Sequence, residues 1–208
     1  MLDKTISDSN FDPDGDLFNS AYLNLTSKIN TLLLHDFQIE IDELTEKVSK
    51  KFQEKPNLPG VIVTEKGQLV GMISRAKFTQ NMSRPYSLEL FLNRPIKSLY
   101  DLLKTDILLI SGNTSVVKGM QKLLERPLEL MQEPIVVEVT PQVYKLLDIH
   151  QLMIAHSEVH LYATRLIGKL CRQLKLNNEK FKELEHRFSI HNPVQFRGFA
   201  VSQNPRFR

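Results

Sequence analysis

The segment that decides the fold occurs twice in the chain. Residues 49–56 read SKKFQEKP, and residues 120–127 read MQKLLERP. Each copy leads into an apolar run, a turn and a second apolar run: VIVTEKGQLVGMIS over residues 61–74 and IVVEVTPQVYKLLD over residues 135–148. Such a repeat predicts two similar units that bury their apolar faces against each other. The cleft between two such units is a place where ligands bind.

Each repeat is predicted to contain a strand, a helix, two strands joined by a turn, and a second helix. In the first repeat, residues 37–41 alternate apolar and polar side chains as a strand does. Asp42 is placed to cap the helix that follows, and Ser74 is placed to cap the helix after the hairpin. In the second repeat the same pattern predicts a strand at 107–110, a helix at 114–124 and strands at 135–139 and 143–147.

Composition divides the rest of the chain into segments around these repeats. Residues 1–16 are acidic and rich in turn formers, and we expect them to be disordered. Residues 17–35 have apolar side chains near helical spacing and are predicted to form an amphipathic lead-in helix. The other predicted segments are the first repeat at 36–82, a packed apolar connector at 83–105, the second repeat at 106–155, a long helix at 156–192 and a flexible basic tail at 193–208.

The overall composition is that of an ordinary globular protein. Of its 208 residues 41% are hydrophobic and 25% are charged, and the net charge is +3. The basic residues do not gather on a single helix and are offset by the acidic amino end, which disfavours a nucleic-acid-binding surface. The single cysteine, Cys171, excludes an internal disulfide and is interpreted as a small core residue of a helix. No apolar run reaches the ~18 residues of a membrane span, and no signal peptide is evident, so we predict a cytoplasmic location.

The last predicted helix is longer than one small repeat can cover. Its apolar residues recur at intervals of three and four, from Leu152 through Leu166, Leu170 and Leu174 to Leu184. This pattern predicts a coiled-coil-like surface and a homodimer, with parallel and antiparallel pairing both open. In the alternative, the lead-in helix folds back and covers the stripe within one chain, through Phe18, Tyr22, Leu25 and Ile29.

The repeated β-α-β-β-α pattern resembles a tandem pair of cystathionine-β-synthase (CBS) domains, often called a Bateman module. The first repeat carries the closer match, in Gly71-Met72-Ile73-Ser74 ahead of a helix. The resemblance implies an α/β fold in which two units are related by a pseudo-two-fold axis. It also implies that a hydroxyl at Ser74, together with an aspartate three residues later, would hold the ribose of an adenine nucleotide.

The sequence departs from that family pattern at the ribose-binding positions. Lys77 stands where the aspartate is expected, and in the second repeat Lys145, Asp148 and Gln151 replace the glycine, the hydroxyl and the acid. A lysine cannot accept a hydrogen bond from ribose, but beside an arginine it suits a phosphate or another anion. We therefore predict four ligand-binding residues: Ser74, Arg75, Lys77 and Asp148. The alternative for Ser74 and Asp148 is helix capping, and for Arg75 and Lys77 it is a solvated helix face.

A second and shorter resemblance is to bacterial sensor histidine kinases. Residues 84–91 (RPYSLELF) and the long helix are similar to the CBS sensor region and linker helix in front of such kinases, and residues 190–194 (IHNPV) to the end of the phosphoacceptor motif. Phe188 occupies the phosphoacceptor position, where it cannot accept a phosphoryl group. The resemblance implies an alternative function, a truncated or degenerate sensor kinase that acts as a dimerisation scaffold, and a signalling partner such as a histidine kinase.

No motif indicates a catalytic centre or a metal centre. All eight glycines are isolated, and neither a phosphate-binding loop nor a His-Glu-x-x-His motif occurs. His156 and His160 have the spacing of two metal ligands on a helix, but no further ligand is indicated, which favours an exposed pair. The sequence predicts a non-enzymatic regulatory module that senses a small ligand or a partner and passes the change to the last helix in signal transduction. No cofactor is expected, with an adenine nucleotide as the alternative.

Overall fold

The computed structural model describes residues 23–191 of the chain, and the side chains among them as far as residue 188. The chain divides into two units, one that ends at Ala163 and one that starts at Thr164. We call residues 23–163 the body and residues 164–191 the extension, and each is described by itself.

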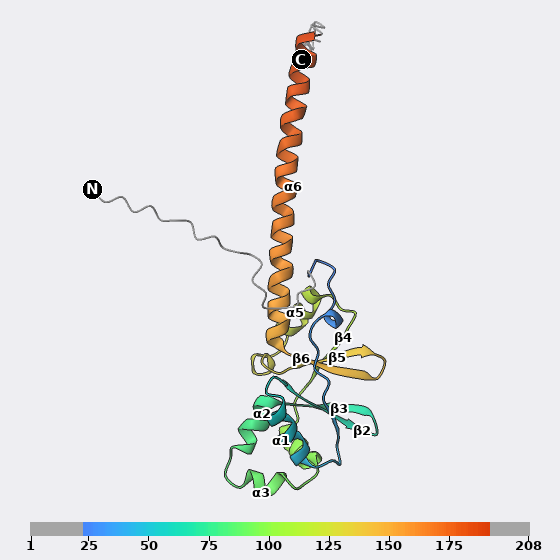
Figure 1. The fold of residues 1–208 in the computed structure, drawn as a ribbon, viewed down its shortest axis with the longest axis vertical. Helices are drawn as coiled ribbons and strands as arrows, with labels where there is room; N and C mark the ends of the chain where they lie inside the picture. The colour runs from blue at the N-terminus through green and yellow to red at the C-terminus, as the bar shows by residue number, and fades with distance from the viewer. Residues whose placement is uncertain (1–22, 192–208) are drawn as a thin grey trace, which may run out of the picture. The chain divides into compact units, whose positions relative to one another are not determined.

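The body contains two copies of the predicted β-α-β-β-α unit (Figure 1), which confirms the fold class. The first repeat consists of β1 (Gln38–Glu40), α1 (Thr45–Glu54), β2 (Gly60–Glu65), β3 (Gln68–Ser74) and α2 (Arg75–Met82). The second repeat consists of β4 (Leu108–Ser111), α5 (Val116–Leu124), β5 (Ile135–Thr140), β6 (Val143–Leu147) and the first turns of α6 (Ile149–His191).

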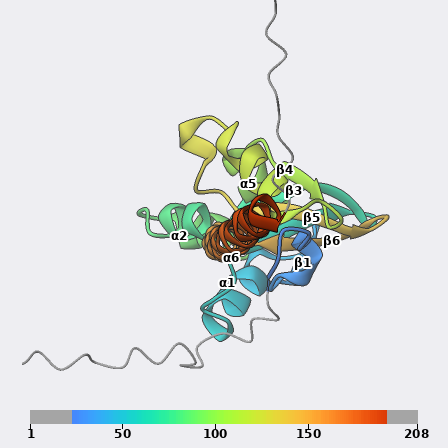
Figure 2. The same ribbon diagram turned by 90° about the horizontal axis from the view of Figure 1, so that it is seen from above.

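The two sheets have the same topology and matching registers. In each sheet the first strand runs parallel to the second, and the second runs antiparallel to the third. Val61 faces Ile73 across the first hairpin, and Ile135 faces Leu147 across the second. Both hairpins point the same way in two perpendicular views (Figures 1 and 2). The sequence repeat is therefore a structural repeat at the level of individual residue pairs.

The paired ends of the two hairpins bury one side against the helices of their own repeat and the other side against the neighbouring repeat. In the first repeat Val61 and Ile73 pack with Phe52 of α1, while Ile62 and Met72 face the other way. A separate cluster joins the two sheets, and its fully buried members are Ile62, Met72, Val136 and Leu146. Val136 and Leu146 hold the register positions in the second hairpin that Ile62 and Met72 hold in the first. Burying each such side chain contributes roughly 1.5–3 kcal/mol.

Each repeat is completed by the chain segment that precedes the other one. Ile29 is fully buried in the core of the second repeat, and its N–H donates to the carbonyl of Thr114 at 2.9 Å. The connector forms α3 (Ser87–Phe91) and α4 (Ile96–Leu103), and Ile96 and Tyr100 are buried in the core of the first repeat. The two repeats are thus interlocked through their connecting segments as well as through their sheets.

The segment predicted as a lead-in helix differs from that prediction. Within residues 23–35 the structure has only one short 3₁₀ turn, Ile29–Thr31. Apart from the bonds of that turn, the N–H groups of Ile29, Asn30 and His35 donate across to the second repeat, to the carbonyls of Thr114, Gly112 and Leu146. Ile29 therefore does not line a helical stripe that covers the long helix. Phe18 and Tyr22, like residues 1–16 and 193–208, lie outside the described residues.

The predicted cap at Asp42 is also wrong. Helix α1 begins at Thr45, and the residue before it, Leu44, offers no capping side chain. The first N–H groups of the helix donate instead to the connector, Thr45 N to the carbonyl of Arg94 and Glu46 N to that of Leu92, each at 3.0 Å. Backbone carbonyls of a distant segment satisfy the free donors that a side chain satisfies at most helix starts.

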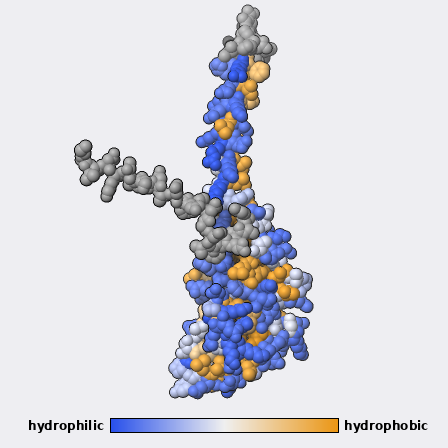
Figure 3. All heavy atoms as spheres, viewed as in Figure 1, coloured by the Kyte–Doolittle hydropathy of each residue, from blue (hydrophilic) through white to orange (hydrophobic). Residues whose placement is uncertain are grey.

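Helix α6 confirms the predicted long carboxyl-terminal helix. Its first turns bury Leu152, Ala155 and Val159 in the core of the second repeat. In the extension the apolar side chains are exposed, and so is Cys171, which the sequence had placed in a core. Apolar side chains recur at intervals along the extension between hydrophilic ones (Figure 3). Among the described residues, no helix has the length and apolar character to cross a membrane.

Candidate functional site

Ser74 ends β3 and begins α2, at the position that the family resemblance singles out. Its side chain is buried, and its Oγ accepts a hydrogen bond from the N–H of Lys77 at 3.3 Å. This bond is a helix cap, the alternative to ligand binding that the sequence indicates for Ser74. The cap also fixes the direction in which Lys77 leaves the first turn of α2.

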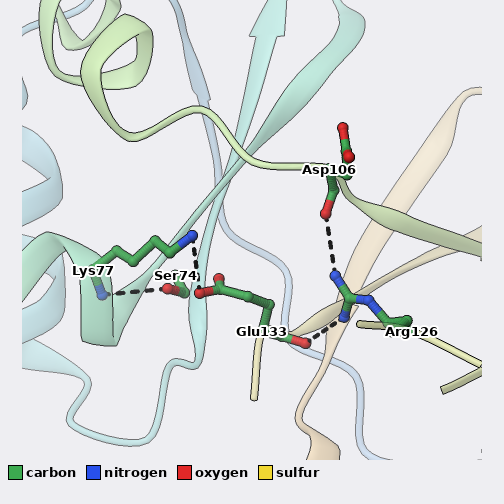
Figure 4. Close-up of polar contacts among 5 residues, drawn as sticks. All are labelled: Ser74, Lys77, Asp106, Arg126 and Glu133. Atoms are coloured by element: carbon green, nitrogen blue, oxygen red, sulfur yellow. Dashed lines mark hydrogen bonds and ion pairs between the residues drawn. The ribbon is translucent and has the colours of Figure 1, made fainter. Parts of the chain in front are cut away.

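Lys77 connects the two repeats. Its Nζ lies 3.3 Å from Oε1 of Glu133, in the loop before β5 (Figure 4). The Glu133 side chain is 8% exposed and that of Lys77 is 26% exposed, so the pair is shielded from water on most sides. The second carboxylate oxygen of Glu133, Oε2, is buried and has no hydrogen-bond partner. A buried carboxylate with one ammonium partner is costly to desolvate, so this contact between the repeats is sensitive to the loss of that partner.

Arg126 holds the loop that carries Glu133. Its Nη1 donates to the carbonyl of Glu133 at 3.0 Å, and its Nη2 donates to the carbonyl of Asp106 at 3.1 Å (Figure 4). Burial lowers the pKa of the Arg126 guanidinium. The carboxylates of Glu133 and Asp106 raise that pKa, but the effect of burial is larger. The guanidinium thus fixes two strand-flanking segments of the second repeat next to α2 of the first.

The ion pair exists because the two repeats differ in one loop. Leu123 follows Phe52 by 71 positions, whereas Ile135 follows Val61 by 74, so the second repeat has three extra residues between α5 and β5. This longer loop contains the 3₁₀ turn Leu128–Leu130 and ends at Glu133. Pro59 holds the corresponding position in the first repeat. The three extra residues, which an alignment of the two copies shows, are the sequence signal that could have pointed to Glu133.

Arg75 does not join this cluster through its guanidinium. Nη2 and Nη1 donate to the carbonyls of Phe52 and Lys55 at 2.9 and 3.0 Å, and the group stacks 5.1 Å from the Phe52 ring centroid. These bonds satisfy free carbonyls at the end of α1, where a cation also complements the helix dipole. Arg75 therefore braces the helix packed beside the site, and its role in binding an anion next to Lys77 stays a prediction.

Asp148 lies at the equivalent position in the second repeat, before α6. It accepts a hydrogen bond from the N–H of His150 at 2.6 Å, which again is capping. Its carboxylate also acts on His35: burial lowers the pKa of that imidazole, Asp148 raises it, and Lys55 lowers it further, with a net lowering. Asp148, His35 and Lys55 hold the repeat positions of Ser74, Asp106 and Arg126.

The junction of the repeats therefore carries two related polar clusters. In the first, hydrogen bonds and an ion pair join Ser74, Lys77, Glu133 and Arg126. On the second side, Asp148 and Lys55 act electrostatically on His35. Each side brings together cationic and anionic groups, with one close ion pair on the first. Across residues 23–191, no group of three or more side chains is arranged to hold a metal ion.

Similarity to known proteins is found among solved structures. No family model and no curated protein matches the sequence. Among solved structures, the CBS-domain containing protein ATU1752 from Agrobacterium tumefaciens is 12% identical with a TM-score of 0.47, over 62% of this chain and 99% of that one. CBSX2 in complex with AMP is 13% identical with a TM-score of 0.47, over 64% and 98%. A CBS-domain-containing protein of unknown function from Bacillus anthracis is 12% identical with a TM-score of 0.48, over 63% and 93%. At this level of likeness the fold assignment stands on the strand order and register of the chain itself.

The ion pair between the repeats predicts a measurable coupling. Lys77→Met should lower the free energy of unfolding by about 1–3 kcal/mol, because it leaves the buried Glu133 carboxylate without its partner. Glu133→Gln should cost less, since Lys77 is partly exposed. The double variant should recover much of the loss and give a coupling energy of about 1 kcal/mol or more in urea denaturation.

The matched control is the pair of Lys50 and Glu46 on the surface of α1, at 2.7 Å with side chains 64% and 40% exposed. An exposed pair four residues apart on a helix should show a coupling below about 0.5 kcal/mol. Equal coupling energies for the two pairs would show that the contact between the repeats is only a surface ion pair.

The lowered pKa of His35 predicts a pH dependence of stability. Because the unfolded chain takes up this proton at a higher pH than the folded one, the contribution of neutral His35 is complete above its ordinary pKa of 6.5. It is lost as the pH falls through the lowered pKa of the folded state. Between about pH 7.5 and pH 5.5 the melting temperature of the wild type should therefore fall more than that of His35→Gln. His186→Gln, in the extension, is the control and should keep the wild-type slope.

Proposed function

We propose that this chain is a non-enzymatic regulatory module. Its two CBS-like repeats sense an anionic small ligand, a nucleotide or another anion, or a partner, and pass the change to helix α6 in signal transduction. The observation that supports this most is the ion pair of Lys77 and Glu133, which joins the repeats while one buried carboxylate oxygen is left without a partner.

An anion that binds Lys77 competes directly with Glu133. The ammonium cannot serve both partners fully, so the bound ligand weakens the bond that ties α2 of the first repeat to the loop before β5. A ligand shifts an equilibrium only by its difference in affinity for two arrangements. Here the difference is built in, because the arrangement with Lys77 released from Glu133 binds the anion better.

The four predicted ligand-binding residues take separate roles in this proposal. Ser74 fixes the first turn of α2, and Lys77 supplies the charge. Arg75 holds the end of α1 in place beside them, as a positioning residue. Asp148 is the counterpart of Ser74 and directly precedes α6, so a change at the junction of the repeats reaches the start of that helix through β6.

An adenine nucleotide is the less favoured ligand. AMP is bound by one of the similar structures, CBSX2, but Lys77 replaces the acid that would accept a hydrogen bond from ribose here. The loss of one charge-assisted hydrogen bond, about 1.5–3 kcal/mol, weakens binding by roughly 10- to 150-fold. As partners we propose a second copy of the chain, through the extension, and a signalling protein such as a histidine kinase. The kinase-like residues 190–194 lie outside the described side chains and add no support for the scaffold alternative.

Thermal-shift titrations test the anion proposal. Inorganic pyrophosphate, a cyclic dinucleotide, AMP and ATP are added to the wild type and to Glu133→Gln. At least one anion should raise the melting temperature in a concentration-dependent way, by the equivalent of about 2.7 kcal/mol at a hundred times its Kd. Glu133→Gln should bind the same anion more tightly, because it frees Lys77, and AMP and ATP should bind no tighter than micromolar.

Lys77→Met should abolish the shift, and Lys47→Met, on the surface of α1, is the charge-matched control that should leave it unchanged. Submicromolar binding of AMP or ATP that survives Lys77→Met would contradict the proposed site. The absence of a shift with every anion, in both wild type and Glu133→Gln, would remove the anion from the proposal.

A further inference from the structure

The extension carries a strict heptad repeat. Positions at alternating steps of three and four residues, starting at Ile167, give seven successive seam residues: Ile167, Leu170, Leu174, Asn177, Phe181, Leu184 and Phe188. Six of the seven are apolar, and their spacing averages 3.5 residues, the period of a left-handed two-stranded coiled coil. The seam covers about 33 Å of helix at 1.5 Å per residue.

These apolar side chains have no cover within the described chain. Leu174, Phe181 and Phe188 are 68%, 60% and 74% exposed, and the other apolar seam residues are more than half exposed. A contiguous apolar strip of this kind marks an interaction surface. Because the strip repeats every 3.5 residues, it fits a partner helix with the same repeat. A second copy of α6 is such a helix.

The single polar seam residue indicates the direction and register of the pairing. In a parallel, in-register pair the same residue from both chains shares a layer, so Asn177 meets Asn177 of the second copy. An amide both donates and accepts, so the two can bond to each other across the axis. In an antiparallel pair, or after a slip of one heptad, each Asn177 meets an apolar seam residue and is buried without a partner.

The flanking charges agree with the same arrangement. In a parallel pair, a residue that directly precedes a seam residue, such as Lys180 before Phe181, faces the residue five positions later on the other chain. Lys180 of each chain therefore lies opposite Glu185 of the other, which gives two such pairs per dimer. An antiparallel pair would instead bring together positions of one kind, which here include Lys180 and Arg187. Lys180 and Glu185 are both exposed in the single chain and are free to form these pairs.

We propose that two copies of the extension form a parallel, in-register coiled coil from Ile167 to Phe188, whose register is fixed by Asn177. The proposal rests on the homodimer of the proposed function and adds its geometry. In a parallel pair the two α6 helices run in the same direction, so a ligand-dependent change in either body acts on the same seam.

Disulfide trapping tests the geometry in the full chain. In a Cys171→Ser background, Leu170→Cys places one thiol in a seam layer, where its copy faces it only in the parallel, in-register pair. Mild oxidation should convert most of this variant to a covalent dimer. Arg172→Cys, on the outer face of the helix, should give at least tenfold less. Leu170 is 55% exposed, so its replacement leaves the folding of the body unaffected.

Charge reversal gives an independent readout. Lys180→Glu should weaken dimerisation about tenfold, because two attractive pairs become repulsive, and the double variant Lys180→Glu with Glu185→Lys should restore it. Light scattering that shows a monomer at micromolar concentration would overturn both the homodimer and the coiled coil. A stable dimer in which Leu170→Cys traps no better than Arg172→Cys, and in which the double variant fails to restore pairing, would overturn only the parallel geometry.

Discussion

The rest of the structure depends on the apolar contact between the two sheets. Ile62, Met72, Val136 and Leu146 fill it, and they hold equivalent register positions in the two hairpins. Because the opposite faces of the same strands pack against their own helices, β2 and β5 are buried on both sides and read as continuous apolar runs. A single repeat would expose one of those faces to water. The repeats therefore exist as a pair, and the polar clusters at their junction exist only because of that pairing.

The two repeats differ in a loop next to the candidate site. The cores match almost position by position, but the loop before β5 is three residues longer than its counterpart. That difference brings Glu133 to Lys77, whereas Pro59 and Gln151 hold the corresponding places on the other side. A fully symmetric pair would bind two equal ligands or none. The asymmetry gives one side the ion pair of Lys77 and Glu133, which we propose an anion displaces, and the other side a histidine whose pKa is lowered by burial.

The sequence predicted what depends on local pattern. The hairpins, the helices of both repeats, the cap at Ser74 and the long last helix follow from apolar period and turn residues, which act over a few positions. The lead-in segment was missed because tertiary hydrogen bonds to Thr114 and Gly112 outweigh its helical spacing. The bonds of Arg75 to α1 and the ion pair of Glu133 were missed for the same reason. Their partners are backbone carbonyls or side chains 20 to more than 50 residues away, which no local pattern contains.

The central claim is that the two repeats form one interlocked body, and hydrogen exchange of the full chain in increasing urea tests it most directly. The amides of β2 and β5 should open with the same free energy, as parts of one cooperative unit. Met72→Ala, a change in the first repeat alone, should lower that free energy by about 2–5 kcal/mol in both strands equally. If β5 stayed protected while β2 exchanged, in the wild type or in this variant, the repeats would be independent units and the account would be contradicted.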